Sequence, residues 1–153
     1  MKYNYYVKNI LWDKCPFCNL RADWILEEWK LFSVILSKAP YTENHLLIIP
    51  NRHFVLLDEM TENELNDLVY LIKKWMKNLK QIYDEVNLIY KDGIVWGSIW
   101  KTVDHFHVHL VPKIHIPVRE LDIQWERQIY SDMQIAKKTK ELKNKLDKIE
   151  KNI

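Results

Sequence analysis

Three histidines alternate with apolar residues in the stretch HFHVHLVPK, which spans residues 105–113. Successive side chains of an extended strand point to opposite faces, so His105, His107 and His109 are expected to share one face. The intervening apolar side chains would then lie on the other face and contribute to a core. Half of the six histidines of the chain fall in this stretch, which makes the histidine face a candidate site of chemistry.

The residues alone leave three interpretations of this triple open. It could be the polar face of an edge strand, or a metal centre that uses two or three alternating imidazoles. It could also hold a nucleophile, in which one imidazole, fixed in one tautomer through its second nitrogen, attacks phosphorus while its neighbours bind phosphate oxygens or transfer protons. Neutral imidazole suits that role because its ordinary pKa is about 6.5.

Cys15 and Cys18, the two cysteines of the chain, stand in CPFC. In a reducing compartment such a pair is more typical of metal binding or redox chemistry than of a structural disulfide. A redox pair is expected at a helix N-terminus, whereas the turn-like NLRAD follows here. If the cysteine pair supplies two ligands of a zinc site, two more ligands are needed, and because the chain has no other cysteine they must be histidines. His53 could be a zinc ligand or a solvated loop residue. His45 is expected in the core, satisfied by one backbone hydrogen bond. His115 is expected at the surface.

Composition excludes several classes of protein. The chain has 153 residues, of which 48% are hydrophobic, so we expect one domain with a sizeable core. Lys and Arg total 23 against 21 for Asp and Glu, which gives no general attraction to nucleic acid or membranes, and an anionic ligand must be held locally. With two glycines, neither a Rossmann nor a Walker phosphate loop fits. No secretory signal is recognisable, and we expect a cytoplasmic protein.

Hydrophobic periodicity predicts the order of the elements. Thr61 and Glu64 form a capping box at the start of a helix of about six turns, whose apolar residues recur at helical spacing up to residue 83. Runs rich in β-branched and aromatic residues predict five strands, over 24–28, 30–36, 45–49, 86–91 and 105–112. Strands that precede and follow one long helix along the chain indicate an α+β domain with a largely antiparallel sheet.

The C-terminal part has a different pattern. Ile135, Leu142, Leu146 and Ile149 form one narrow apolar stripe in a lysine-rich background. This predicts a solvated helix packed on the domain or on a second subunit, in preference to a basic arm for nucleic acid, because acidic residues interrupt the charge run. We therefore expect a single domain over 1–153, with a core of about 15–117 and a helical extension of about 118–153.

HFHVHLVP resembles the histidine triad of the HIT superfamily, His-x-His-x-His followed by two apolar residues and often a proline. CPFC, NHLLIIPNRH, one long helix and the triad follow in the family's order over residues 15–113. The resemblance implies a five-stranded antiparallel sheet with helices against it and a homodimer. SKAPYTENHLLIIPNRH, with Asp104 before the triad, is more similar to the dinucleoside tetraphosphate phosphorylase and uridylyltransferase-like branches than to the small phosphoramidases.

The same resemblance implies roles for individual residues. His107 would be the nucleophile that takes the nucleotidyl group from an α-phosphate, and His109 would support phosphate binding and the position of that imidazole. In members that carry zinc, the matching ligands are Cys15, Cys18, His53 and His105. A closed Cys2His2 set of this kind is typical of structural zinc.

The chain departs from the family pattern at two positions. Lys101 stands where many members have a glutamine; lysine cannot accept a hydrogen bond but can offset phosphate charge. We expect Lys101, Thr102, His109 and backbone amides of 97–102 to bind phosphate oxygens. Ser37 stands where relatives hold the ribose hydroxyls with an acidic residue or asparagine.

The predicted function is that of a nucleotide hydrolase or nucleotidyltransferase. It would act at the α-phosphate of a dinucleoside polyphosphate or a nucleoside phosphoramidate, through a covalent nucleotidyl-histidine. The alternative is a non-catalytic nucleotide-binding or scaffold protein on the same fold, with Lys101 and Ser37 as signs of a lost active site. A catalytic metal on the triple itself is a third interpretation.

Overall fold

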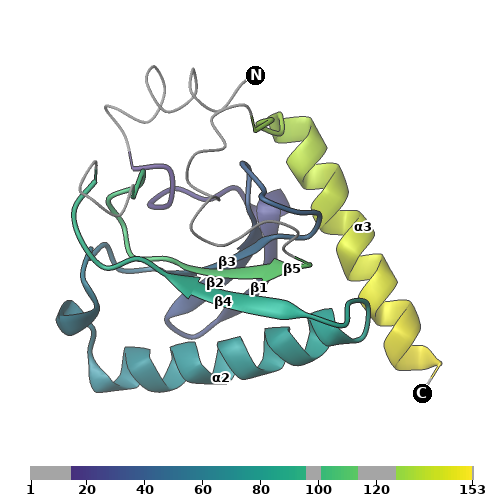
Figure 1. The fold of residues 1–153 in the computed structure, drawn as a ribbon, viewed down its shortest axis with the longest axis horizontal. Helices are drawn as coiled ribbons and strands as arrows, with labels where there is room; N and C mark the ends of the chain where they lie inside the picture. The colour runs from purple at the N-terminus through teal and green to yellow at the C-terminus, as the bar shows by residue number, and fades with distance from the viewer. Residues whose placement is uncertain (1–14, 96–100, 114–126, 153) are drawn as a thin grey trace.

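A five-stranded antiparallel sheet forms the centre of the computed structural model, which describes residues 15–95, 101–113 and 127–152. The strand order is β1-β2-β3-β5-β4, and every neighbouring pair is antiparallel. Figure 1 shows α2 along one face of the sheet and α3 beside it. The predicted α+β class and five-stranded sheet are confirmed.

The elements are β1 (Ile25–Trp29), β2 (Phe32–Leu36), β3 (Leu46–Pro50), α2 (Glu62–Lys80), β4 (Val86–Tyr90), β5 (Val108–Pro112), α3 (Asp132–Lys151) and the short 3-10 helices η1 (Ala22–Trp24) and η2 (Leu57–Glu59).

Helix α2 begins where the capping box predicts. The Thr61 side chain accepts a hydrogen bond from the Glu64 amide, and the Glu64 carboxylate accepts one from the Thr61 amide. Two of the four amides that a helix start leaves unpaired are thereby satisfied. The buried apolar residues of α2 pack on the sheet face that carries Phe106, and they are Leu68, Leu71, Trp75 and Leu79.

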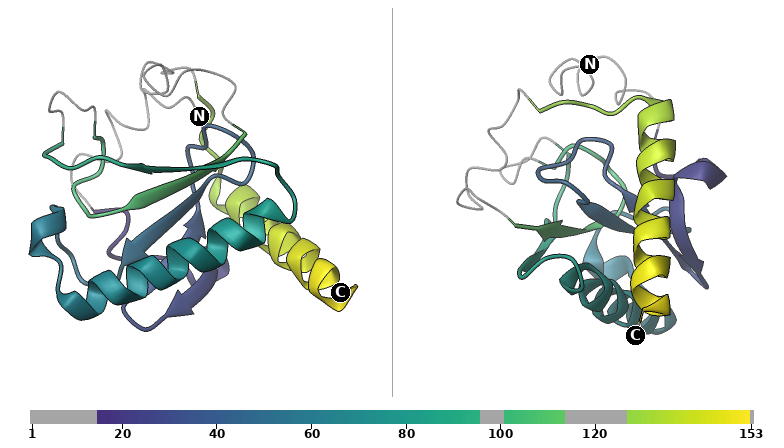
Figure 2. Two further views of the ribbon diagram at one scale, coloured as in Figure 1. Left: turned by 60° about the horizontal axis from the view of Figure 1, so that its bottom comes forward. Right: turned by 90° about the vertical axis from the view of Figure 1, so that its right-hand side faces the viewer.

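Helix α3 packs against its own domain. Ile135, Leu142 and Leu146 are buried in the same core cluster as β2, β3 and β5. Thr139 Oγ1 donates to the Ile135 carbonyl at 2.8 Å and lies 3.5 Å from the Trp24 carbonyl, which ties the helix to η1. Figure 2 shows α3 crossing one end of the sheet. The predicted apolar stripe is therefore part of the domain core.

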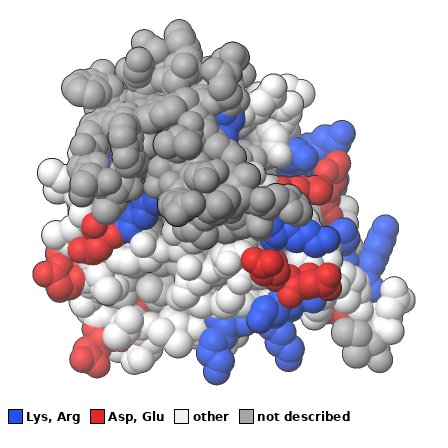
Figure 3. All heavy atoms as spheres, viewed as in Figure 1, with Lys and Arg blue, Asp and Glu red and all other residues white. Residues whose placement is uncertain are grey.

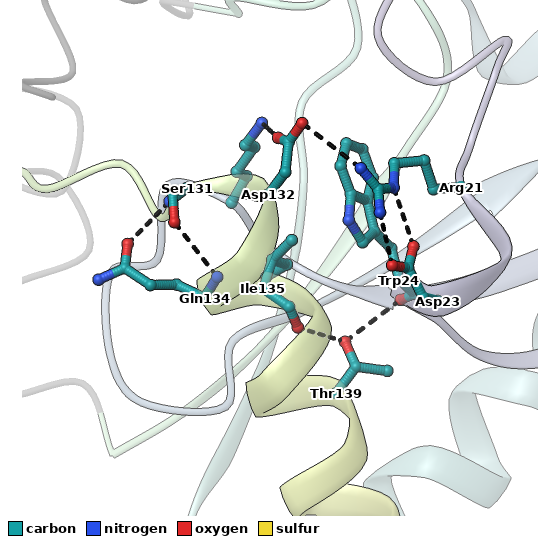
Figure 4. A network of polar contacts seen from close by, with 9 residues as sticks. Arg21, Asp23, Trp24, Ser131, Asp132, Gln134, Ile135 and Thr139 are labelled. Carbon is teal, nitrogen blue, oxygen red and sulfur yellow. Dashed lines mark hydrogen bonds and ion pairs between the residues drawn. The ribbon is translucent and has the colours of Figure 1, made fainter.

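Polar contacts fix the start of α3 (Figure 4). Ser131 and Gln134 form a second capping box, in which the Ser131 hydroxyl accepts from the Gln134 amide at 3.2 Å. Asp132 accepts from Lys38 Nζ at 2.5 Å and lies 3.8 Å from Arg21. The chain leading into α3 is thereby held beside the turn that follows β2.

Strand β5 is shorter than the sequence predicts, because it begins at Val108 and not at residue 105. The register pairs Val108 with Ile48, and two residues further it would place Phe106 opposite Pro50, which has no amide hydrogen to continue the ladder. The Pro50 carbonyl instead lies 2.9 Å from Nε2 of the His105 ring. His105 and His107 therefore stand just before the strand.

Basic and acidic side chains are interspersed on the described part of the face in Figure 3. This agrees with a net charge of only +2 at pH 7. Neither α2 nor α3 is apolar enough over its length to cross a membrane, and no other helix within the described ranges is.

Candidate functional site

Two cysteines and two histidines meet beyond the end of β3 and before the start of β5, which are neighbouring inner strands of the sheet. The ligand atoms of Cys15, Cys18, His53 and His105 all lie within 4.8 Å of one another. His105 Nδ1 is 3.0 Å from His53 Nδ1 and 3.3 Å from Cys15 Sγ, and Cys18 Sγ is 3.2 Å from His53 Nδ1. A tetrahedral zinc ion with Zn–N of about 2.0 Å and Zn–S of about 2.3 Å would separate its ligand atoms by about 3.3 to 3.8 Å. The group is therefore compact enough to hold such an ion.

The His105 ring is oriented for this cluster by its second nitrogen. Nε2 lies 2.9 Å from the Pro50 carbonyl, and because a carbonyl only accepts, Nε2 carries the hydrogen. Nδ1 is then unprotonated and faces the two thiols. A ligand ring held by a backbone carbonyl through its other nitrogen is the usual arrangement in metal sites.

Phe17, between the two cysteines, connects this cluster to the second histidine of the triad. Its ring lies edge-on to His105, with centroids 5.9 Å apart, and edge-on to His107, at 5.2 Å. The turn that carries the cysteines therefore also forms one wall beside the His107 ring.

His107 is held as a neutral imidazole with a defined tautomer. Its Nδ1 lies 2.7 Å from the His105 carbonyl and must donate to it, so the lone pair is on Nε2. Burial lowers the pKa of His107 to about 4, although the bond to the carbonyl opposes that shift. At pH 7 this ring is therefore uncharged, with its lone pair on Nε2.

His109 is the last member of a chain of hydrogen bonds. The Tyr41 amide donates to His45 Nδ1 at 3.1 Å, so the His45 hydrogen is on Nε2, which lies 2.9 Å from His109 Nδ1. His109 Nδ1 therefore accepts, and its Nε2 carries a hydrogen that it can donate to a ligand. Burial lowers the pKa of His45 to about 3 and that of His109 well below its ordinary value, so both rings are neutral at pH 7.

His45 has more partners than the sequence predicts. It is buried as expected, with 1% of its surface exposed, but it bonds both the Tyr41 amide and His109. The register pairs Leu47 with His109, and His45 lies two residues before Leu47, on the same face. A period of two applied to the third strand could have found this contact from the sequence.

An open cavity lies over His107 and His109, with about 640 Å³ of empty space when the adjoining solvent is included. The structure places four cationic side chains on its described lining and no acidic one. The lining residues are Pro16, Phe17, Ser37, Lys38, Ala39, Tyr41, His45, Leu47, Lys91, Lys101, Thr102, Val103, His107, His109 and Arg127.

The structure places the residues predicted to bind phosphate in different surroundings. Lys101 lines the cavity but is 2% exposed, and its ammonium donates to the carbonyls of Val55 and Gly93, each at 3.1 Å. Thr102 and Ser37 also line the cavity, as expected. Residues 97–100 of the predicted amide loop, and His115, lie outside the described residues.

The Nδ1 atoms of the triad engage three different partners, which are the cysteine cluster, a carbonyl and His45. Over the described ranges, the Cys2His2 cluster is the group that brings metal ligands together. This arrangement offers no support for a catalytic metal on the triple itself.

Comparison with known proteins matches residues 21–116 to the HIT domain. The chain belongs to the HIT domain family. The adenosine 5'-monophosphoramidase HNT1 of Saccharomyces cerevisiae is 31% identical over 87% of this chain and 83% of its own length. A bis(5'-nucleosyl)-tetraphosphatase of Schizosaccharomyces pombe is 28% identical over 69% of this chain, which spans only 54% of that protein.

The fold comparison agrees with this membership. A zinc-bound histidine triad protein from Mycobacterium smegmatis superposes with a TM-score of 0.63 at 22% identity, covering 89% of this chain and 97% of its own. The predicted family is confirmed, and the tetraphosphatase agrees with the predicted nearness to enzymes of dinucleoside tetraphosphates. With relatives that are named enzymes, this chain is a HIT-family enzyme, as the sequence predicts.

Proposed function

We propose that this HIT-family enzyme transfers or hydrolyses a nucleotidyl group through a covalent intermediate on His107. The substrate is a nucleoside phosphate derivative, either a dinucleoside polyphosphate or a nucleoside phosphoramidate. The single observation that carries the proposal is the tautomer of His107, whose hydrogen is committed to the His105 carbonyl, leaving a lone pair on Nε2 in a ring that lines an open cavity.

The reaction divides into two displacements at phosphorus. His107 Nε2 forms a bond to the α-phosphorus as the bond to the leaving group breaks. The leaving group departs as a nucleoside polyphosphate anion or, after taking a proton from solvent, as an amine. Water, which gives up a proton to solvent, or phosphate then attacks the same phosphorus, the N–P bond breaks, and the imidazole returns to its neutral form. The cationic ring in the intermediate makes a good leaving group for this second step.

His109 supports both steps by donating from Nε2 to a phosphate oxygen. Its hydrogen is on that nitrogen because His45 donates to the other one. A preorganised donor of this kind stabilises charge as it develops on the phosphate oxygens in the transition state. Thr102 adds a hydroxyl to the cavity lining, and Lys101, whose ammonium is bonded to the Val55 and Gly93 carbonyls, adds positive charge near it.

We further propose zinc as the metal of the Cys2His2 cluster, with a structural role. Cys15, Cys18, His53 and His105 would supply all four ligands, so the ion has no open position for substrate. When bound, zinc would link the N-terminal turn to the segment before β5. The chain's own contribution is to hold Phe17 and the His105 carbonyl against His107.

Replacing His107 by alanine tests the mechanism. We expect kcat for diadenosine tetraphosphate and for adenosine 5'-phosphoramidate to fall by about 10⁴-fold or more, because the nucleophile is lost. In the wild-type protein, intact mass after rapid denaturation at alkaline pH, where the N–P bond of a nucleotidyl-histidine is stable, should reveal a covalent adenylyl group, and peptide mapping under the same conditions should place it on His107.

The matched controls are the melting temperature and zinc content of the variant, which should equal those of the wild type. Turnover that survives in the His107→Ala protein would reject the covalent mechanism. A wild-type protein that binds nucleotide but turns over neither substrate would favour the non-catalytic binding alternative.

We also propose that the chain forms a homodimer in the cytoplasm. β4 is an edge strand of the sheet, and Leu88 on it is 49% exposed, which leaves backbone groups and apolar surface available for a second copy. The molar mass from light scattering decides between one chain and two.

A further inference from the structure

The segment that precedes α3 returns to the candidate site. The Tyr130 amide donates to the Lys38 carbonyl at 2.9 Å, and Ile129 is buried. Asp132 at the first turn of α3 binds the Lys38 ammonium, so backbone and side chain of Lys38 both anchor this segment. Residue 127, just upstream of these anchors, is thereby fixed beside the turn that follows β2.

Arg127 is placed against the histidine chain by a stack of rings. Its guanidinium carbon lies 4.2 Å from the centroid of the Tyr41 ring, which suits a cation–π contact. Tyr41 in turn stacks on His45, with centroids 4.9 Å apart and planes 14° apart. His45 bonds His109, so three stacked groups connect Arg127 to the predicted phosphate-binding ring.

The charge of Arg127 acts on the same rings. After burial, its positive charge is the next cause of the lowered pKa of His45, and it contributes to the lowered pKa of His109. Arg127 also lines the cavity directly. A guanidinium in that place adds to the effect of burial, which keeps both imidazoles neutral, and it offers planar, paired donors, the geometry that binds phosphate oxygens.

We propose that Arg127 is a phosphate-binding residue of this site, supplied by the C-terminal extension. The proposal rests on the proposed nucleotide function and extends it. The HIT domain match ends at residue 116, so this arginine comes from sequence outside the family's matched region. The inference gives α3 and its leading segment a functional role, which is to hold a cation over a cavity whose described lining has no acidic residue.

The test compares Arg127→Gln with Lys143→Gln, which removes one positive charge from an exposed position of α3 outside the cavity. AMP and adenosine binding are measured by calorimetry, and kcat/KM is measured with diadenosine tetraphosphate. We expect Arg127→Gln to weaken AMP binding and lower kcat/KM by about tenfold to a hundredfold, since it removes a charge-assisted hydrogen bond. Adenosine binding should not change, and Arg127→Lys should restore part of the loss.

Each outcome of this test either supports or overturns the phosphate-binding role of Arg127. AMP affinity and kcat/KM at wild-type levels in Arg127→Gln would overturn it, while an inactive His107→Ala protein would leave the proposed function standing. An equal loss of adenosine and AMP affinity would also overturn it, because the effect would then be on the shape of the site. If the wild type turns over no substrate but AMP binding depends on Arg127, the phosphate-binding role holds and the proposed reaction fails.

Discussion

The positions of the ring hydrogens on His107 and His109 are set by neighbouring groups of the fold. His107 gives its Nδ1 hydrogen to a backbone carbonyl two residues earlier, and His109 receives a hydrogen from His45. One ring therefore presents a lone pair to the cavity and the other presents a donor. Two identical side chains obtain opposite roles from their neighbours, with no charge on either at pH 7.

His45 is the residue on which this assignment can be tested. In His45→Leu, His109 loses the donor to its Nδ1, and the tautomer with hydrogen on Nδ1 becomes populated. We expect kcat to fall by about tenfold or more, because the donor to phosphate is present in only part of the molecules. Nitrogen chemical shifts of the His109 ring should report the change of tautomer directly.

His45→Gln provides the comparison for that variant, since an amide hydrogen can replace the imidazole donor and should recover part of the rate. A His45→Leu protein with wild-type kcat and an unchanged His109 tautomer would contradict the role of His45. Loss of rate without a tautomer change would indicate a packing effect alone.

At this scale the resemblance to the HIT superfamily predicted that Cys15, Cys18, His53 and His105 come together, which the spacing of these residues alone had left open. It did not predict Phe17 or Arg127 at the site. Phe17 is a single aromatic residue in a tight turn, and its direction depends on how the two cysteines fold back on His105. Arg127 depends on the packing of α3 and the Lys38 anchor, which no local pattern reports.

Both long helices begin with a capping box, and the two boxes use different side chains. α2 uses Thr61 with Glu64, and α3 uses Ser131 with Gln134. The neutral amide in α3 shows that capping itself needs no charge. Glu64 has a further partner, because Arg52 binds both of its carboxylate oxygens at 2.9 Å, and this bond holds the pKa of Glu64 down at about 2.

Glu64→Gln keeps the capping geometry and removes the ion pair. We expect the free energy of unfolding at pH 7 to fall by about 2 kcal/mol. A carboxyl group with a lowered pKa stabilises the fold above its ordinary pKa of 4.5, and that stabilisation is lost as the pH falls toward about 2. The difference between wild type and variant should therefore shrink across that range in urea unfolding curves.

Glu62→Gln is the control, since it removes a charge from the same first turn at an exposed position. A pH-independent difference for Glu64→Gln, or an equal effect of Glu62→Gln, would show that the Arg52 pair contributes nothing specific.

The elements themselves were largely readable from the sequence. The first four strands lie within one or two residues of their predicted bounds, and α2 begins where predicted and ends three residues early, because period and turn residues are local signals. The exception is β5, which starts three residues late. Its start depends on Pro50 in a neighbouring strand, which is a long-range effect of the sheet register.

For the molecule as a whole, the Cys2His2 cluster joins segments far apart in the chain. A bound zinc ion would cross-link the N-terminal turn, the loop after β3 and the segment before β5. We expect about one zinc per chain, and its removal with a chelator should lower the melting temperature by about 5 °C or more.

The double variant Cys15→Ser, Cys18→Ser should melt at the lower temperature with or without the chelator. Absence of metal by elemental analysis, with no effect of the chelator on the wild type, would reject the zinc assignment.

Because α3 is buried in the common core, it limits where the chain can be truncated. The family match stops at residue 116, yet Ile135, Leu142 and Leu146 complete the packing around β2 and η1. A gene shortened at the family boundary would encode a polypeptide with an uncovered apolar flank, prone to precipitate. Recombinant work on this enzyme should therefore retain the chain through residue 151.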